Sequence, residues 1–558
     1  MILIVARRHV SDSVMSEVPS SNTYIPHKQS AQSRPRGINR WIALSLLILF
    51  LVSPFTPLWA ANQSTEAEKY ANSGLDLAQA GNLAAAEAEL RQAVRLAPRN
   101  PSFLADLGTV LAMERKLGES TDILKRALQL DSSNLTAQQY LAANLWQLHR
   151  YIEAKQELKA LLKKKPGDKP ATLLLGMVSE NLKDYAAAAR LLGSVPALVR
   201  ERPESIAALA RSLYHTGQKE KARAALQQLL THPAGPQGVS LGAQIADEMH
   251  DYATAEKLLL SIKPAFPDQA TVGYQLALVQ FHAKGFAEAQ RTLQNLIDSG
   301  YKSGKVSNLL GWCYLQQHLP QQAVSAFDQS IALEPEQESN YLDLANLLLI
   351  NRSLPAALKV AKRTTEAFPN SQQAFGLRGS VELKLGQFND AIDSYRKVLR
   401  IDPNNSDAAL GLAEAQYAAG ITKDAIASFE GSLKQFPKDA RFRLQYALLL
   451  LKESETGNAV SEARAEHLLK SAIALSPSLP GAHYYLGDLA LKKGQIAEAI
   501  WYLERATKID SRSAKVHFAL SRAYRRVGRK QEASREMAFY QNLKESESTF
   551  SPDDLSPQ

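Results

Sequence analysis

The chain has 558 residues, of which 45% are hydrophobic, 22% charged and 7% aromatic. It is too long for one compact core, and its composition excludes a disordered protein. Its single cysteine, Cys313, excludes an intrachain disulfide framework and any cysteine-based metal cluster. The net charge of +9 is uneven, because residues 501–545 hold eleven Lys and Arg against five acids.

The N-terminal region has the features of a targeting segment. Residues 1–40 are predicted to be a disordered region or a signal n-region, and they end in the basic stretch RPRGINR. An apolar run then extends to two prolines and the small residues Ala60 and Ala61. This order resembles a secretory signal peptide cleaved near Ala60 or Ala61, while residues 41–61 are also long enough for an uncleaved inner-membrane anchor. Either interpretation predicts that the rest of the chain is exported to the periplasm or cell envelope.

From residue 67 to about residue 545 the chain repeats itself every 34 residues. Fourteen rows start at residues 67, 101, 135, 169, 203, 236, 270, 304, 338, 372, 406, 440, 480 and 514. Position 20 of the row is Ala in thirteen rows, with Ser120 as the exception, and position 8 is always small. Position 24 is large and apolar in all rows but one, and position 32 is Pro in eight rows.

This pattern predicts two short antiparallel helices, A and B, in each row. Small side chains at positions 8 and 20 let the two backbones approach, and the large side chain at position 24 fills the space beside them. Glycine near position 15, as in Gly81 and Gly386, permits the turn after helix A. Proline at position 32 ends helix B. One such hairpin buries little surface alone, so stacked neighbours must supply the core.

The pattern resembles the tetratricopeptide repeat over nearly nine-tenths of the chain. The resemblance implies an all-α protein, a right-handed α-solenoid of about fourteen repeats, of the type found in exported bacterial proteins. We expect repeats 1–5 in residues 67–235, repeats 6–14 in residues 236–545, and a disordered tail in residues 546–558. Pro233 and Pro236 predict a joint or change of curvature near residues 231–238. A six-residue insertion in the twelfth row predicts a longer A–B loop.

No catalytic motif accompanies the repeats. The eleven histidines form no metal-binding spacing, and neither a nucleophile elbow nor a dinucleotide-binding loop is present. The stretch GYKSGKVS departs from a phosphate-binding loop, since it is one residue short and lacks the hydroxyl position. We therefore expect no enzyme activity, no cofactor and no metal, although catalysis by residues of the repeats remains an alternative.

In the tetratricopeptide family, positions 2, 5, 9, 12 and 13 of helix A line a concave groove. Here these positions carry an aromatic and polar set suited to capturing a protein or peptide. The resemblance thus implies a partner-binding groove lined by Trp146, Gln147, Asn181, Arg211, Tyr214, His215, Tyr274, Phe281, His282, Trp312, Gln316, Asn346, Tyr417, Tyr484, Asp488, Arg522 and Arg525. An aromatic side chain at such a position can instead pack against the neighbouring helix, as Trp312 beside Gly311 could.

The last row is strongly basic, and two interpretations of it stay open. It can be a solvated cap of the final repeat, or it can contact an anionic surface or glycan. We expect no nucleic acid partner for an exported chain, and membrane contact only through the N-terminal segment if that segment is uncleaved. The function predicted is a non-catalytic interaction scaffold of the cell envelope. The alternative is a periplasmic component of a polysaccharide secretion or assembly system.

Overall fold

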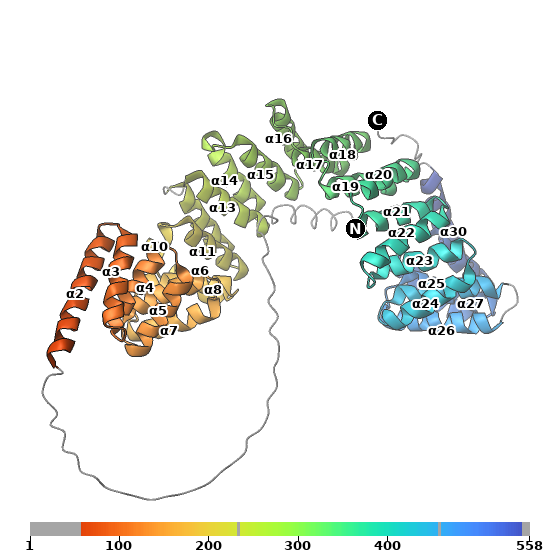
Figure 1. Cartoon of the computed structure of the whole chain (residues 1–558). Helices are drawn as coiled ribbons and strands as arrows, with labels where there is room; N and C mark the ends of the chain where they lie inside the picture. Colours follow the sequence, from red (N-terminus) through yellow and green to blue (C-terminus); the bar gives the residue numbers. More distant parts are fainter. Residues whose placement is uncertain (1–56, 232–234, 456–458, 549–558) are drawn as a thin grey trace, which may run out of the picture. The chain divides into compact units, whose positions relative to one another are not determined.

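The computed structural model describes residues 57–231, 235–455 and 459–548, which contain helices and no β-strand (Figure 1). Residues 1–40 and 41–56 of the predicted targeting segment lie outside the described residues, as do residues 549–558 of the predicted tail. Residues 57–61 form the first turns of helix α2. None of the helices within the described ranges combines the length and the apolar character that a bilayer crossing requires.

The first helix of each repeat begins at the predicted row start in eleven rows. This agreement confirms the 34-residue register and the α-solenoid of tetratricopeptide repeats. The A helices are α2 (Pro57–Gln79), α4 (Pro101–Met113), α6 (Leu135–Gln147), α8 (Lys169–Asn181), α11 (Pro203–His215), α13 (Gly235–Glu248), α15 (Gln269–His282), α17 (Gly304–Gln316), α19 (Glu338–Ile350), α21 (Gln372–Lys384), α23 (Ser406–Ala418), α25 (Ala440–Ser454), α27 (Pro480–Lys492) and α29 (Ala514–Arg526).

The B helices alternate with the A helices along the chain. They are α3 (Leu83–Leu96), α5 (Leu117–Leu130), α7 (Tyr151–Lys164), α9 (Tyr185–Gly193), α12 (Lys219–Gln227), α14 (Tyr252–Ile262), α16 (Phe286–Asp298), α18 (Pro320–Leu333), α20 (Leu354–Ala367), α22 (Phe388–Ile401), α24 (Thr422–Gln435), α26 (Ala459–Leu475), α28 (Ile496–Ile509) and α30 (Lys530–Ser548). Three short helical segments follow the shortened B helices of rows 4 to 6: α10 (Pro196–Arg200), η1 (Gln228–Leu230) and η2 (Lys263–Ala265).

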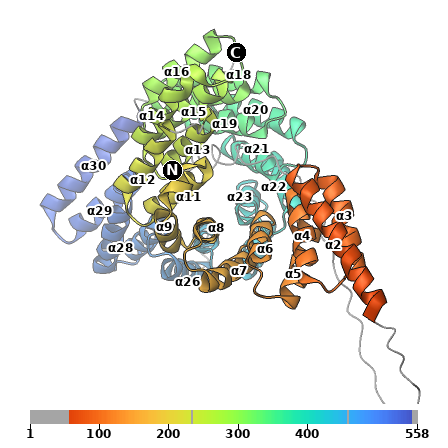
Figure 2. The same cartoon turned by 90° about the vertical axis from the view of Figure 1, so that its left-hand side faces the viewer.

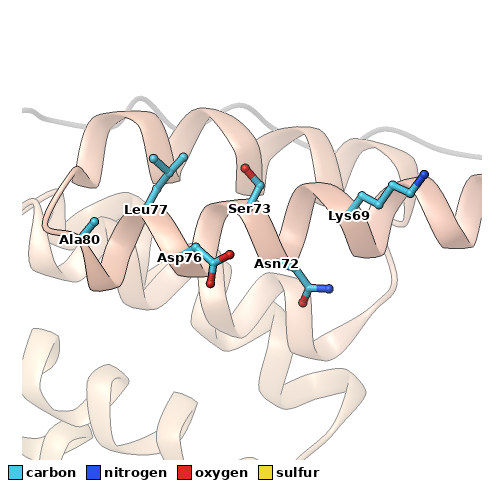
Figure 3. A pocket seen from close by; sticks show the side chains of 6 residues that line it. All are labelled: Lys69, Asn72, Ser73, Asp76, Leu77 and Ala80. Atoms are coloured by element: carbon cyan, nitrogen blue, oxygen red, sulfur yellow. The ribbon is translucent and has the colours of Figure 1, made fainter.

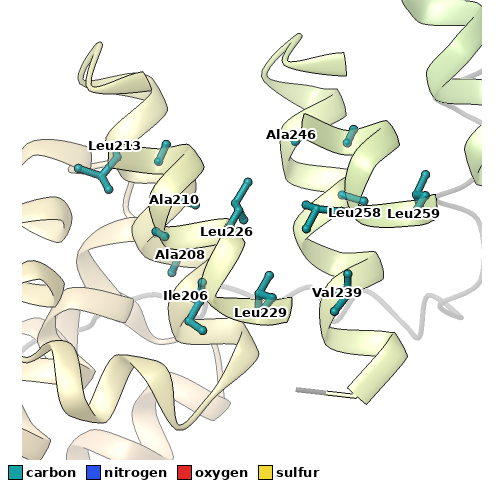
Figure 4. Packing of buried hydrophobic residues seen from close by; sticks show 14 of the residues in the cluster. Ile206, Ala208, Ala210, Leu213, Leu226, Leu229, Val239, Ala246, Leu258 and Leu259 are labelled. Atoms are coloured by element: carbon teal, nitrogen blue, oxygen red, sulfur yellow. The ribbon is translucent and has the colours of Figure 1, made fainter. Parts of the chain in front are cut away.

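The chain divides into two compact units, unit 1 up to Ala283 and unit 2 from Lys284 onward. Within each unit, consecutive helices pack side by side in antiparallel pairs (Figures 1 and 2). The predicted joint near residues 231–238 falls inside unit 1, where Leu229 of η1 and Val239 of α13 belong to one hydrophobic cluster (Figure 4). The apolar core is therefore continuous across this region, and the division at residue 283 was not anticipated from the sequence.

The small residues at position 8 are explained by the side chain at position 24. A Cβ added to Gly108 would lie 2.6 Å from Leu124 Cγ, and one added to Gly487 would lie 2.7 Å from Leu503 Cγ. Ser120, the exception at position 20, donates a hydrogen bond to the Gly108 carbonyl and accepts one from Asn144 at 2.7 Å. The exception is thus tolerated because its hydroxyl is satisfied in the closely packed contact.

The turn after helix A is left-handed in every row whose turn is described. Glycine occupies this position in six rows, as predicted, with φ near 80°. In seven other rows the same conformation is adopted by basic residues, namely Arg115, His149, Lys183, His250, Lys284, His318 and Arg352. A basic side chain at a helix C-terminus interacts favourably with the helix dipole, which offsets part of the left-handed strain.

Two predictions about chain segments are corrected by the helix boundaries. The six-residue insertion does not form a long loop, because α25 extends to Ser454 and α26 begins at Ala459 with 17 residues. The inserted residues mainly lengthen these two helices. Residues 546–548, predicted to belong to a disordered tail, are instead the end of α30, which continues to Ser548.

Candidate functional site

Five A helices of unit 1 carry a row of mostly polar side chains in their C-terminal halves. We call this row the unit 1 wall and define it by Trp146, Glu180, Asn181, Arg211, Asp247, Glu248 and His282. Its members come from five consecutive A helices, α6, α8, α11, α13 and α15. Four of the seven were predicted from the sequence as binding residues.

Trp146 and Asn181 connect the first two helices of the wall. The Trp146 indole N–H donates to Asn181 Oδ1 at 2.8 Å. The Trp146 ring is half-buried and packs against the hydrophobic cluster of α4 to α8. One edge of the ring is therefore fixed by packing, while its N–H is held by the next repeat.

A chain of charges continues from α8 to α13. Arg211 Nη1 donates to Glu180 Oε1 at 2.7 Å, and Arg211 Nη2 lies 3.5 Å from Glu248 Oε2. Burial alone would lower the pKa of Arg211, but the bond to Glu180 outweighs it, so the pKa is raised. Glu180 is only 8% exposed, which makes this a largely desolvated ion pair.

Asp247 and His282 extend the wall to α15. His282 Nδ1 lies 2.8 Å from Asp247 Oδ1 and 3.0 Å from Oδ2. The carboxylate accepts, which places the proton of the neutral ring on Nδ1 and leaves Nε2 as an acceptor. The His282 side chain is 29% exposed.

Three acids of the wall, Glu180, Asp247 and Glu248, were not among the predicted binding residues. They occupy positions 12 and 13 of their repeats, which are two of the five positions that line the groove in this family. The signal for them was therefore present in the sequence. Including them changes the formal charge of the wall from +1, due to Arg211, to −2 with His282 neutral.

Other predicted residues of unit 1 lie beside the wall. Tyr214 donates to Asp251 Oδ2 at 2.8 Å, and His215 stacks on the Tyr185 ring with centroids 3.9 Å apart. Both therefore face the start of a neighbouring B helix. Gln147 is exposed at the end of α6, and Tyr274 is half-buried on α15.

Trp312 and Phe281 were predicted to line the groove, with helix packing as the alternative for Trp312, and the structure buries both side chains. Trp312 is 5% exposed, donates to Asp343 Oδ2 at 3.3 Å and meets the Phe327 ring edge-on. Phe281 is 8% exposed. Each holds helices together and offers almost no area to a partner, because neighbouring side chains cover it.

The remaining predicted residues are scattered along unit 2. Gln316, Asn346 and Tyr417 are half-buried on α17, α19 and α23, and burial raises the pKa of Tyr417. The structure brings none of these three into hydrogen-bond contact with another.

The predicted residues of the last two repeats form a second group. The Lys515 ammonium lies 4.8 Å from the centre of the Tyr484 ring, and Asp488 pairs with Lys492 at 3.2 Å. Arg522 and Arg525 are exposed on α29, and the Arg522 guanidinium lies 5.9 Å from the Phe518 ring. This group combines cations with aromatic faces.

The groove positions of the two units differ in charge. In unit 1 these positions hold five acids against one arginine, whereas in unit 2 they hold nine Lys and Arg against three acids. The basic residues concentrate in the last three repeats. The groove positions are thus predominantly acidic in unit 1 and predominantly basic in the last three repeats of unit 2.

Within the described ranges, no three His, Cys, Asp or Glu side chains gather closely enough to hold a metal ion. A shallow depression follows the outer face of α2, lined by Lys69, Asn72, Ser73, Asp76, Leu77 and Ala80 (Figure 3). Four of its six lining residues are polar, and the depression contains no converging set of catalytic groups.

Comparison with protein families identifies the class of protein that this fold and wall define. Family models described as tetratricopeptide repeat match residues 72–134, 141–203, 208–232, 274–340, 314–372, 342–406, 382–449 and 463–515. The chain belongs to the tetratricopeptide repeat family. Repeats of this family are typically non-catalytic and bind protein or peptide partners.

Individual relatives match only in part. The human protein O-mannosyl-transferase TMTC3 is 27% identical over 41% of this chain and 24% of its own length. Cellulose synthase 1 operon protein C of Komagataeibacter xylinus is 22% identical over 58% of this chain and 26% of its own length. The chain thus spans about a quarter of each relative, so neither activity transfers to it. The crystal structure of yeast Tom70 covers 87% of this chain and 97% of its own, at 14% identity and a TM-score of 0.36.

Proposed function

We propose that this chain is a non-catalytic scaffold that holds a segment of another protein along the unit 1 wall. The observation that carries the proposal is the connected row of side chains from Trp146 to His282 across five A helices. A row of this kind is rigid before binding, because its members already hold one another. Little conformational entropy is then lost when a partner docks.

The wall also indicates the chemistry of the partner segment. The wall holds three acids against one arginine, which favours a segment rich in Lys and Arg. Trp146 adds an aromatic surface on which an arginine or an apolar side chain can rest. An extended basic peptide satisfies both features.

We place this scaffold in the cell envelope. The support is the order of residues 34–61, with a basic stretch, an apolar run and small residues, which is typical of exported chains. An uncleaved segment would anchor the chain in the inner membrane. Secretion of a fusion of residues 1–66 to a reporter protein, followed by N-terminal sequencing, tests both the export and the cleavage.

The test of the binding site uses the full chain immobilised and exposed to envelope extract, with captured proteins identified by mass spectrometry. A double variant, Asp247→Asn with Glu248→Gln, should weaken the binding of the captured partner by about tenfold. Asp122→Asn, which removes an exposed acid on α5 away from the wall, is the matched control. Equal capture by the double variant and the control would exclude the wall as the binding site.

A second candidate function is supported by the basic groove positions of the last three repeats. These repeats would contact an anionic glycan as part of a polysaccharide secretion or assembly system. The relative named as a protein of a cellulose synthase operon, matched over 58% of this chain, favours this alternative. Retention on an immobilised acidic polysaccharide, lost in an Arg522→Gln and Arg525→Gln double variant, would support it over the protein scaffold.

A further inference from the structure

Helix B of each repeat has an outward face, carried by positions 22 and 26, which lie one turn apart. Position 22 is exposed in all fourteen repeats, and position 26 is exposed or half-buried. In repeats 1–12 these two positions hold only charged residues, polar residues, alanine or glycine. This composition suits a helix face that stays in water.

The last two repeats depart from this pattern. Position 22 of α28 is Trp501, which is 49% exposed, and position 26 of α30 is Phe539, which is 42% exposed. Each ring contacts one neighbouring ring, that of Tyr502 and that of His517 respectively. Nearly half of each residue nevertheless remains in water, so packing between repeats does not account for the two rings.

Arginine accompanies each aromatic ring, and we call Trp501, Arg505, Arg535 and Phe539 the outward patch. The Arg505 guanidinium lies 4.4 Å from the centre of the Trp501 ring, and that of Arg535 lies 5.7 Å from the centre of the Phe539 ring. Helices α28 and α30 both pack against α29 (Figure 2). Because equivalent positions of successive repeats face the same side, the two aromatic–arginine pairs belong to one surface.

The positive charge around the outward patch is only partly balanced by acids. Residues 501–545 hold eleven Lys and Arg against five acids. Glu504 and Glu532, on the same two helices, pair with Arg529. Within the described residues, neither Arg505 nor Arg535 forms an ion pair with a carboxylate. Both guanidinium groups can therefore bind an anion outside the chain.

The charge on the outward face of α28 is graded along the helix. Glu498 lies one turn before Trp501, and the exposed Lys508 lies one turn after Arg505. Ile509, which ends the helix, is 39% exposed. The C-terminal half of α28 thus offers cations and apolar surface together.

We infer that the outward patch binds the surface of an anionic lipid bilayer. Tryptophan and other aromatic rings settle at the level of the lipid headgroups. Arginine and lysine beside them bind the phosphates, and the negative surface potential of anionic lipids attracts these cations. The outward patch presents both kinds of side chain on one face, at positions that the twelve earlier repeats keep polar or small.

A protein or a glycan fits the outward patch less well than a bilayer does. An aromatic anchor in a protein interface is packed into a pocket and surrounded by contacts that exclude water. Trp501 and Phe539 instead stand on an exposed helix face, each with a guanidinium group beside its ring. An acidic glycan would meet Arg522 and Arg525, which lie at groove positions of helix A. A bilayer surface requires neither a pocket nor a groove.

Bilayer contact through helix B leaves the groove positions of helix A available. It adds a second membrane contact to the one that we expected only from the N-terminal segment. It does not depend on the unit 1 wall, so the inference and the proposed peptide binding can fail separately.

The test uses the full chain with a fluorophore attached to one introduced cysteine. Asn542→Cys, on α30 one turn after Phe539, reports contact at the patch, and Ala427→Cys, at position 22 of repeat 11, is the matched control site; both residues are exposed. Cys313 is buried and stays unlabelled. Vesicles of phosphatidylglycerol and phosphatidylcholine in equal parts, with a nitroxide-bearing lipid, should quench the label at position 542 and leave that at position 427 nearly unchanged. Vesicles of phosphatidylcholine alone should not distinguish the two positions.

Charge variants of the chain labelled at position 542 identify the residues that carry the contact. Arg505→Gln with Arg535→Gln should lower the vesicle affinity about 25-fold, because each cation at an anionic surface contributes about fivefold. Lys359→Gln with Arg363→Gln removes the same two charges from positions 22 and 26 of repeat 9. This matched control should lower the affinity by less than about twofold, because salt screens charges that lie away from the bilayer.

The aromatic rings and the competing partners complete the test. Trp501→Ser with Phe539→Ser should lower the vesicle affinity about tenfold. Equal quenching at positions 542 and 427, or equal losses in the two charge variants, would overturn the inference. A label at position 542 that responds to a soluble acidic polysaccharide or to envelope proteins, but not to vesicles, would overturn it in favour of that partner. Circular dichroism confirms that each variant keeps its helices.

Discussion

The Trp146 indole N–H donates to Asn181 Oδ1 at 2.8 Å, and this bond joins the A helices of two successive repeats. Both residues were predicted from the sequence to face a partner, and the structure shows that they also face each other. The bond orients the exposed part of the indole ring. A residue in the unit 1 wall can thus serve both the stacking of repeats and the surface offered to a partner.

We expect Asn181→Ala to reduce the stability of the α6–α8 contact by about 1 kcal/mol, the usual net value of a hydrogen bond. Trp146→Phe should cost more, because it also removes packing area. A double-mutant cycle should give a coupling energy between the two of about 0.5–1 kcal/mol. Amide hydrogen exchange in α6 and α8 gives the local opening free energies of each variant, from which the coupling energy is calculated. Gln147→Ala is the control.

The Glu180–Arg211 pair predicts an asymmetric response to mutation. Arg211→Met leaves the nearly buried Glu180 carboxylate without its cation and should destabilise the contact between α8 and α11 by about 3 kcal/mol. Glu180→Gln should cost less, because Arg211 is more exposed and keeps Glu248 nearby. Hydrogen exchange in α8 and α11 checks the order, and equal losses would contradict it.

We expect the protonation of Asp251 to make the folded protein less stable in acid. Burial alone would raise the pKa of Asp251, but hydrogen bonds from Arg223 and Tyr214 outweigh it and hold the pKa below its usual value. A lowered folded-state pKa gives stability that is present above pH 4 and is lost as the pH falls through the folded-state value. The contact between α11 and α14 should therefore weaken below pH 4.

The Asp251→Asn variant isolates this effect. It should be less stable than the parent chain at pH 6, and the difference should shrink as the pH is lowered from 4 toward 2. Urea denaturation of both proteins across this range provides the measurement. A difference that stays constant with pH would show that Asp251 does not carry the acid sensitivity.

A glycine at position 8 and a glycine elsewhere in a helix should respond in opposite ways to substitution by alanine. A methyl group at Gly487 would lie 2.7 Å from Leu503 Cγ, so Gly487→Ala should destabilise by about 1–3 kcal/mol. Gly431, inside α24, has no atom within 4 Å of an added Cβ. Gly431→Ala should therefore stabilise by about 0.5–1 kcal/mol, because alanine favours the helix. Thermal unfolding of the two variants gives the comparison.

The sequence was sufficient for the repeat register because the register depends on local packing. Positions 8 and 24 of one hairpin contact each other within 16 residues, as Gly108 and Leu124 do, so each row carries its own evidence. In eleven rows the start of the A helix was predicted from the same repeat positions. The fold class and the starts of most A helices therefore needed no information from distant parts of the chain.

The unit 1 wall was only partly predictable because it depends on contacts between repeats. Trp312 is covered by Asp343 of the next repeat, 31 residues away, whereas Trp146 is half-buried, although both stand at positions, 9 and 12, that line the groove in this family. The acids Glu180 and Asp247 occupied informative positions, but their role became visible only through Arg211 and His282. Side-chain partners across repeats are set by the stacking geometry, which the 34-residue period does not specify.

The left-handed turn after helix A yields a last pair of opposing mutations. Arg352 and Gly386 occupy equivalent positions, with φ of 58° and 75°. Arg352→Gly removes the strain of a side chain in this conformation, which costs about 1–2 kcal/mol, but it increases the entropy of the unfolded chain. The net expectation is a stabilisation of about 0.5–1 kcal/mol.

Gly386→Arg should destabilise by a similar amount, because the side chain adds strain that the helix dipole only partly offsets. Urea denaturation at low and high salt measures both, and high salt should make Gly386→Arg more harmful by screening the dipole. If Arg352→Gly instead destabilises the protein, the arginine makes a contact whose value exceeds its strain, and the basic residues at these turns would be selected for that contact.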